Sequence, residues 1–433
     1  MSTSQRLYEK YKNSPILSKL GKKWKNVYLI FAFNAYQPRV NKKVFINYEK
    51  EKRIYDFKKF DPLLEKKLEK AEQTRKINIL DYAITKSYIP ILSLAEKFPD
   101  SITLIFSQIT LDEIKNFYPN LYKKITKMSE KEIELGLSSY HHVIPQMLDE
   151  KEIYYEYFLP LEKNSFYKND ITVHFPEQIT CEKLIKSLHN YALQKDIHFT
   201  ILLDSTHHNL SYNEIRIPIV FKNFPRIRAI FRHNYLSNQI AFHTNIIDPE
   251  STAVDIMSYY INSLFFDPYF SSKAERGEKI YLLLAVDAET IGMHIKNLDL
   301  AFFEFFKLAN EYFTLSSVRK YINEFSFRKI EDKIAFNKSW SGGLERWYRN
   351  ETKFLKDRIN KIRERVHKVL ETDVSEKKLM RLKFLISSYY FNSMLSCPYW
   401  WNDPNAPVTV EAIRNIEKVE EYVEKFEKVK EED

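Results

Sequence analysis

The sequence predicts an α/β protein with a mostly parallel sheet, closed or nearly closed, followed by a region of helices. Three observations lead to this prediction. Short apolar runs alternate with helical-period segments from Val27 to about Asn310. Two of the apolar runs end in an acidic residue, Glu177 and Asp287. After about Asn350 the strand signals vanish and helical periodicity remains.

Runs of β-branched and apolar residues bounded by turns predict the strands. In chain order these are residues 27–33, 102–107, 171–175, 199–203, 228–232 and 279–286. Segments 182–194 and 298–313 have helical spacing. Because strands lie on both sides of helices in the chain, we expect a mostly parallel sheet whose loops gather at one rim.

The carboxyl-terminal region shows two apolar stripes with helical spacing. Their residues are Leu355, Ile359, Ile362, Val366 and Val369, and then Ile413, Ile416, Val419, Tyr422 or Val423, and Phe426. Both runs are short for a coiled coil, so we expect these helices to pack against the main domain.

Composition excludes several classes of protein. A hydrophobic content of 44% is too high for a disordered chain, and none of the six glycines has the spacing of a phosphate-binding loop. The two cysteines, Cys181 and Cys397, argue against a disulfide scaffold and a thiolate metal site. No signal peptide or membrane-spanning run is apparent, so we expect a cytoplasmic protein without a membrane partner.

The net charge of +9 raises the possibility of a polyanionic partner. The lysines, however, are scattered and alternate with glutamate-rich stretches. This pattern favours a solvated surface, and we expect no nucleic-acid partner.

Glu177 and Asp287 are the candidate catalytic residues. Each follows an apparently buried strand, and in barrels of alternating strands and helices the chemistry collects where strand ends meet the loops. The alternative for Glu177 is an exposed residue that complements a helix dipole. The alternative for Asp287 is a helix cap. Two carboxylic groups on either side of a glycosidic bond can cleave it without a metal or a cofactor.

Two aromatic clusters and two histidine pairs are further candidates. The clusters are residues 340–348 and 398–403, and tryptophan rings stack on sugars, although most tryptophans are simply core. The pairs His141-His142 and His207-His208 invite a metal interpretation. Adjacent histidines on a strand point to opposite faces, so hydrogen bonding is favoured, and His142 is a candidate to hold a substrate hydroxyl.

Five segments in order resemble glycoside hydrolase family 57. Residues 34–38 end in Gln-Pro, with Tyr36 where the family usually has histidine; residues 134–145 contain a Tyr-x-His core. Residues 174–177 resemble Trp-x-Pro-Glu, with His174 in place of tryptophan, and residues 287–294 resemble Asp-Gly-Glu-Thr-Phe-Gly-x-His. Residues 339–347 and 396–401 resemble the helical region that closes the glucan cleft in one branch of the family.

This resemblance implies a distorted seven-stranded (β/α) barrel over residues 26–310, after an extension of residues 1–25 and before a helical domain of residues 311–433. It implies a retaining enzyme for α-linked glucan, with Glu177 as the nucleophile and Asp287 as the acid/base. The substrate would be an α-glucan or oligosaccharide, with no cofactor and no metal. The substrate-binding residues would be Tyr36, Gln37, His142, Glu289, His294, Trp340, Trp347 and Trp400.

Two alternatives remain open. The altered residues Tyr36 and His174 favour a glucan-binding or regulatory barrel with little or no turnover. A metal-dependent deacetylase or mannosidase would need histidine and aspartate ligands after the first strand, and Asn34-Ala35-Tyr36 offers neither. The sequence leaves the oligomeric state open.

Overall fold

The computed structural model contains a closed barrel of seven parallel strands, as expected. It describes residues 2–14, 16–37, 43–45, 55–207, 216–246, 248–325, 327–330 and 336–432. The strand order is β10-β1-β4-β5-β6-β7-β9, and a pairing between β9 and β10 closes the barrel. The barrel strands are β1 Val27–Ala35, β4 Ile102–Phe106, β5 Ile133–Leu137, β6 Asp170–Val173, β7 His198–Asp204, β9 Ile227–Arg232 and β10 Ile280–Asp287.

The structure confirms the six predicted strands and adds β5. The run 133–137 contains Glu134 and Gly136, which interrupt the apolar pattern. Glu134 is fully buried, yet it accepts hydrogen bonds from Thr103 and Thr172 on the neighbouring strands. At Gly136 a Cβ atom would lie 2.6 Å from Cγ1 of Ile105, so only glycine fits this packing without a shift.

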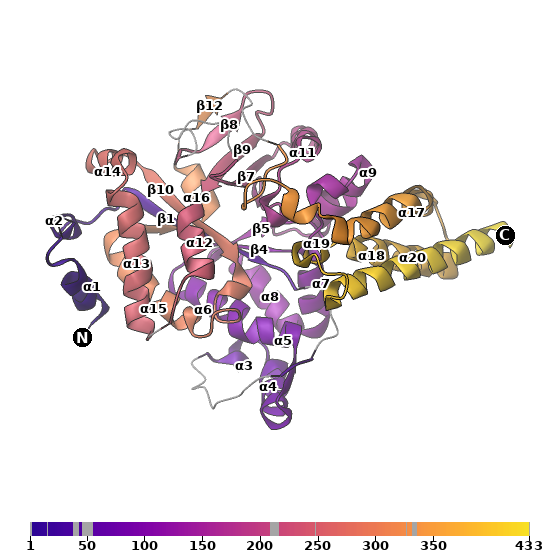
Figure 1. The fold of residues 1–433 in the computed structure, drawn as a ribbon, viewed down its shortest axis with the longest axis horizontal. Helices are drawn as coiled ribbons and strands as arrows, with labels where there is room; N and C mark the ends of the chain where they lie inside the picture. The colour runs from indigo at the N-terminus through magenta and orange to yellow at the C-terminus, as the bar shows by residue number, and fades with distance from the viewer. Residues whose placement is uncertain are drawn as a thin grey trace.

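Helices surround the barrel, and the helical region extends from one side of it (Figure 1). The two termini lie at opposite ends of the molecule (Figure 1). The α-helices that precede the carboxyl-terminal region are α1 Thr3–Tyr11, α2 Leu17–Leu20, α3 Phe57–Phe60, α4 Pro62–Thr74, α5 Ile79–Ala83, α6 Ile89–Lys97, α7 Gln108–Phe117, α8 Pro119–Met128, α9 Glu150–Ile153, α10 Leu159–Lys163, α11 Glu182–Lys195, α12 Asn234–Phe242, α13 Pro249–Phe265, α14 Pro268–Glu275, α15 Leu298–Tyr312 and α16 Val318–Asn323.

Smaller elements complete this part of the fold. Strand β11 pairs with β1, β2 pairs with β3, and β8 pairs with both β9 and β12. The π-helical turns η1 and η3 interrupt the helices that follow β3 and β5. Their bounds are β2 Lys43–Phe45, β3 Lys76–Asn78, β8 Ile219–Phe221, β11 Thr314–Ser316, β12 Arg328–Ile330, η1 Ile84–Tyr88 and η3 Tyr154–Phe158.

Alternation along the strands separates two cores. In β1, Tyr28, Ile30 and Ala32 pack inside the barrel with residues of β9 and β10. The intervening Leu29 and Phe31 face the surrounding helices. Because successive side chains of a strand point to opposite faces, one apolar run supplies both cores.

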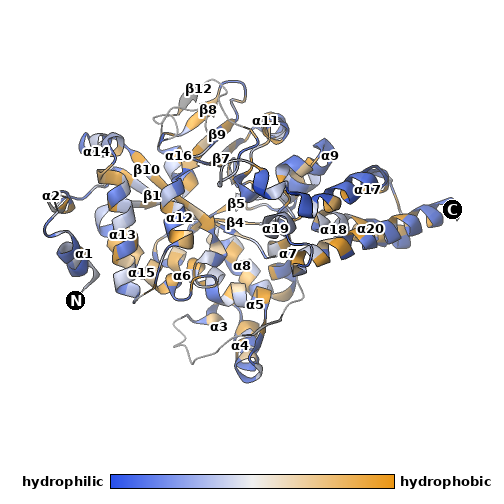
Figure 2. Cartoon of the chain, viewed as in Figure 1, coloured by the Kyte–Doolittle hydropathy of each residue, from blue (hydrophilic) through white to orange (hydrophobic). Residues whose placement is uncertain are grey.

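The carboxyl-terminal region consists of α17 Lys353–Glu371, α18 Lys377–Ser393, α19 Ser396–Trp401 and α20 Pro407–Glu432. The five residues of the first predicted stripe are all buried in α17, and Ile416, Val419, Val423 and Phe426 are buried in α20. Figure 2 shows apolar and polar residues on different faces of these helices. Their apolar faces join one continuous core with β5, β6, β7 and β9 of the barrel. The helices therefore pack against the main domain.

Candidate active site

Glu177 and Asp287 lie at the rim formed by the carboxyl-terminal ends of the barrel strands. Glu177 belongs to the turn Pro176–Gln178 between β6 and α11. Asp287 is the last residue of β10 and pairs in register with Asn34 of β1. Both are therefore at the rim where barrel enzymes carry their chemistry.

The backbone at this rim is left-handed at three non-glycine residues. The φ angle is 57° at Glu177, 50° at Gln178 and 60° at His142. Such conformations are uncommon for residues with a Cβ atom and persist where surrounding contacts impose them. Here the carbonyl oxygen of Gln178 accepts a hydrogen bond from Nε2 of His207 at 2.9 Å. The left-handed turn sets the direction of the Glu177 side chain.

The Glu177 carboxyl is partly buried and receives a hydrogen bond from a tryptophan. Nε1 of Trp340 lies 3.2 Å from Oε2 of Glu177. Burial and then the charge of Asp287 raise the pKa of Glu177, the Trp340 hydrogen bond lowers it, and the net result is a pKa of about 7. The two carboxyl groups therefore interact, and Glu177 changes its charge near neutral pH.

The Asp287 carboxyl meets solvent at the rim, yet the protein atoms around it displace much of its hydration. This desolvation raises the pKa of Asp287, while His294, Asn34 and Arg232 lower it. Burial and then the charges of Glu177 and Asp287 raise the pKa of the nearby Cys397 thiol to about 12. Both carboxyl groups therefore lie at the same strand-end rim, near the Cys397 thiol.

Glu289 is buried beside this pair and is tied to the first motif. Its Oε1 accepts hydrogen bonds from the backbone nitrogen of Tyr36 at 3.1 Å and from Nε2 of Gln37 at 3.3 Å. The hydroxyl of Tyr88 donates to the same oxygen. Burial, with a contribution from Asp287, raises the pKa of Glu289 to about 8. Glu289 thus fastens the end of β1 to the end of β10.

Three aromatic rings form a stack near the same rim. The ring of Tyr36 lies 4.2 Å from that of His142, and His142 lies 6.5 Å from His174, each pair nearly parallel. Burial lowers the pKa of each of the two histidines to about 3, so both are neutral at physiological pH. His294 is exposed, and desolvation lowers its pKa while Asp287 opposes that change.

The three predicted tryptophans form one cluster with different exposures. The ring of Trp400 lies 5.4 Å from Trp340 and 5.9 Å from Trp347. Trp340 and Trp400 are partly exposed, whereas Trp347 has no exposed surface and lies in the core. The Arg346 guanidinium stacks 3.4 Å from the Trp400 ring centroid. Trp340 and Trp400 are thus the rings that solvent reaches.

Asp204 and Arg232 belong to the site although the sequence analysis did not select them. A buried ion pair joins them at 3.0 Å, and Nδ2 of Asn234 donates to both oxygens of Asp204 at 3.0 Å. Each ends a barrel strand, the same signal that identified Asp287. The sequence does not show which strands are neighbours in the barrel. It therefore gave no sign that Asp204 and Arg232 lie at the same rim as Glu177 and Asp287.

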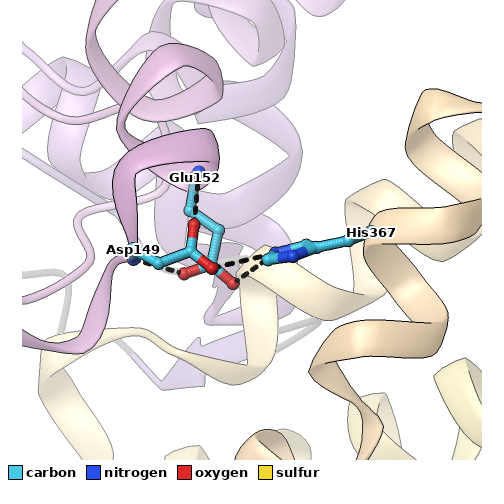
Figure 3. A group of neighbouring side chains, drawn as sticks. All are labelled: Asp149, Glu152 and His367. Carbon is cyan, nitrogen blue, oxygen red and sulfur yellow. Dashed lines mark hydrogen bonds and ion pairs between the residues drawn. The ribbon is translucent and has the colours of Figure 1, made fainter.

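One group of three possible metal ligands occurs among the described residues. It consists of Asp149, Glu152 and His367, whose ligand atoms lie within 4.8 Å of one another (Figure 3). The carboxylates already cap α9 through a capping box, and Glu152 also pairs with Arg363 at 2.9 Å. We therefore interpret the group as a polar connection between α9 and α17. Pro38 and His208 from the sequence analysis lie outside the described residues.

Known structures share this fold. No protein-family model and no curated protein matches the sequence. The exo-type maltose-forming amylase of Pyrococcus sp. ST04 is 14% identical, with a TM-score of 0.66 over 92% of this chain and 81% of that chain. A family 57 branching enzyme of Thermococcus kodakaraensis is 13% identical, with a TM-score of 0.64 over 93% and 89%. The 4-α-glucanotransferase of Thermococcus litoralis is 15% identical, with a TM-score of 0.57 over 92% and 60%.

The chain therefore has the fold of these family 57 enzymes, in agreement with the motif resemblance. Within the described ranges, none of the helices is long and apolar enough to cross a bilayer.

Proposed function

We propose that this chain is a retaining glycoside hydrolase or transglycosylase that acts on an α-linked glucan. The observation that carries the proposal is the placement of Glu177 and Asp287 at the same strand-end rim, Glu177 directly after β6 and Asp287 at the end of β10. Two carboxyl groups with raised pKa values readily share a proton, which is the state that a nucleophile and an acid need. The fold shared with an amylase, a branching enzyme and a glucanotransferase supports the substrate class.

In the first step Glu177, ionised, attacks the anomeric carbon. The glycosidic C–O bond breaks, and Asp287 donates its proton to the leaving oxygen. In the second step ionised Asp287 takes a proton from an incoming hydroxyl, whose oxygen displaces Glu177 and restores the configuration. Water as the incoming group gives hydrolysis, and a sugar hydroxyl gives transfer. Neither step requires a metal, and we propose that none takes part.

The neighbouring groups suit a neutral polyhydroxylated substrate. Tyr36, Gln37, His142, Glu289 and His294 offer donors and acceptors beside the pair, and the solvent-reachable Trp340 and Trp400 offer faces for sugar rings. Trp347 supports Trp400 from the core. We propose an α-glucan or oligosaccharide as the partner, without nucleic acid, and a cytoplasmic location.

Product analysis tests this proposal. The purified protein, Glu177→Gln and Asp287→Asn are incubated with maltooligosaccharides and glycogen, with and without a chelator. Glu130→Gln, an exposed glutamate remote from the rim, is the control. We expect products from the unmodified protein and the control with or without chelator, and at least about 1,000-fold slower turnover in both site variants.

Other results would select an alternative. Glucan binding without any product would favour the binding or regulatory barrel. Loss of turnover with chelator alone would favour a metal-dependent carbohydrate enzyme.

A further inference from the structure

A cavity of about 460 Å³ lies between the barrel helices and the carboxyl-terminal helices. One wall comes from α4, α5 and α7, and the other from α18 and α20. Figure 1 shows these two sets of helices on either side of the boundary between the barrel and the helical region. The volume is within the range of about 300–1,000 Å³ typical of small-molecule sites.

Two residues connect this cavity to the candidate active site. Gln37 lines the cavity, and its Nε2 donates to Glu289 at 3.3 Å. Leu395 also lines the cavity and directly precedes Ser396, whose backbone nitrogen donates to the His142 carbonyl oxygen at 3.2 Å. The cavity is therefore adjacent to the candidate active site.

The walls combine exposed aromatic rings with polar side chains. Phe384 of α18 is 70% exposed and Phe117 of α7 is 56% exposed, on opposite walls. Large exposed aromatic rings on facing walls are suited to pack against the C–H faces of sugars. Asn78, Asn392 and Asn415 also line the cavity; each amide makes at least one internal hydrogen bond, and its remaining donor or acceptor capacity can serve hydroxyl groups.

The charge of the cavity argues against a polyanionic ligand. Its formal charges are one lysine, Lys67, against Asp81, Glu113 and Glu411. Lys67 is itself engaged, since its Nζ lies 3.6 Å from Asp81 and donates to the Tyr118 hydroxyl at 2.6 Å. An acidic excess within a chain of net charge +9 disfavours phosphates and suits a neutral ligand.

We propose that this cavity binds a remote part of the same α-glucan chain whose bond is cleaved at Glu177 and Asp287. The inference rests on the proposed function. Binding in the cavity makes the enzyme selective for long chains, because a short oligosaccharide cannot reach both the carboxylate pair and the cavity.

The test compares KM and kcat for maltotriose and for a long linear α-glucan in Phe384→Ala and Phe117→Ala. Phe266→Ala, 68% exposed at the end of α13, is the matched control. We expect KM for the long chain to rise about two- to tenfold in both cavity variants, with kcat and the maltotriose KM unchanged. The control should behave like the unmodified protein.

Three outcomes would contradict the proposals, each in its own way. Unchanged KM for both substrates in both cavity variants overturns the inference and leaves the proposed function intact. An equal rise for both substrates also overturns it, because chain-length selectivity is then absent. No conversion of either substrate by the unmodified protein overturns the proposed function, and the inference with it.

Discussion

Trp340 belongs to the tryptophan cluster and also donates a hydrogen bond to the Glu177 carboxyl. Its N–H stabilises the ionised carboxylate and lowers the pKa of Glu177. In Trp340→Phe the ring remains and the donor is lost, so that pKa should rise. Because Glu177 must be ionised to attack, the acidic limb of kcat/KM should move to higher pH, by about one unit.

The pH profile of kcat/KM measures this shift directly. Trp401→Phe is the control, since Trp401 is 65% exposed on the neighbouring helix α19. An acidic limb that stays in place in Trp340→Phe would show that the indole does not set the ionisation of Glu177.

Glu289 should make the stability of the protein depend on pH. Its pKa is about 8 in the folded protein against an ordinary value of 4.5, because it is buried. The unfolded chain therefore loses this proton first, and the free energy of unfolding should fall as pH rises from about 4.5 to about 8. Glu289→Gln has no proton to lose and keeps an oxygen for the three donors, so this decline should shrink by a few kcal/mol, roughly 1.4 per pH unit.

Denaturant unfolding of both forms at several pH values between 4 and 9 checks this expectation. Glu130→Gln, at an exposed site, should follow the unmodified protein. Parallel curves for Glu289→Gln and the unmodified protein would mean that Glu289 is not the group responsible.

At the scale of elements, a buried polar group fastens the helical region to the barrel. Glu152 of α9 is fully buried and accepts from Arg363 of α17 and from the hydroxyl of Tyr390 on α18. Arg363 also donates to the Met147 carbonyl oxygen at 2.6 Å. Removing one partner of a buried ion pair leaves an uncompensated charge, which typically costs about 3–5 kcal/mol.

We therefore expect Arg363→Met to lower the free energy of unfolding by about 3 kcal/mol, and Arg363→Met with Glu152→Gln to lower it by less. The control is Arg358→Met on the same helix, whose pair with Glu420 at 2.6 Å is about one-third exposed on each side and should contribute less than about 1 kcal/mol. Equal losses in Arg363→Met and Arg358→Met, measured by denaturant unfolding, would contradict this account of the connection.

The strands show which elements could be predicted and which could not. The six predicted runs were recognisable because β-branched and apolar residues dominate them, as a strand buried on both faces requires. Strand β5 breaks that pattern with Glu134. The buried Glu134 carboxylate depends on hydrogen bonds donated by Thr103, Thr172 and the backbone of Arg319. Those partners are distant in sequence, so no local rule reveals them.

At the scale of the whole molecule, the helical region shares an apolar core with one side of the barrel. Residues of β6, β7 and β9 form a continuous apolar cluster with α17, α18 and α20. A shared core predicts that the two regions unfold together. We expect fluorescence, which reports mainly on the four tryptophans between 340 and 401, and far-UV circular dichroism, which reports on all helices, to give coincident midpoints.

The variant Trp24→Phe sharpens this test, because its fluorescence then comes only from those four tryptophans. Its two midpoints should also coincide. Separate transitions would mean that the helical region is an independently stable unit.

The sequence by itself determined the fold class, the carboxyl-terminal helices and the position of Glu177 and Asp287 at strand ends. These features depend on periodicity and on residues adjacent in the chain, which local sequence records. Only the tertiary structure decided that both carboxyls lie near the Cys397 thiol, that Arg232 forms a buried ion pair with Asp204, and that Trp340 rather than Trp347 donates to Glu177. Closure of the barrel and the docking of the helices bring these residues together from distant parts of the chain, and no local pattern encodes such distances.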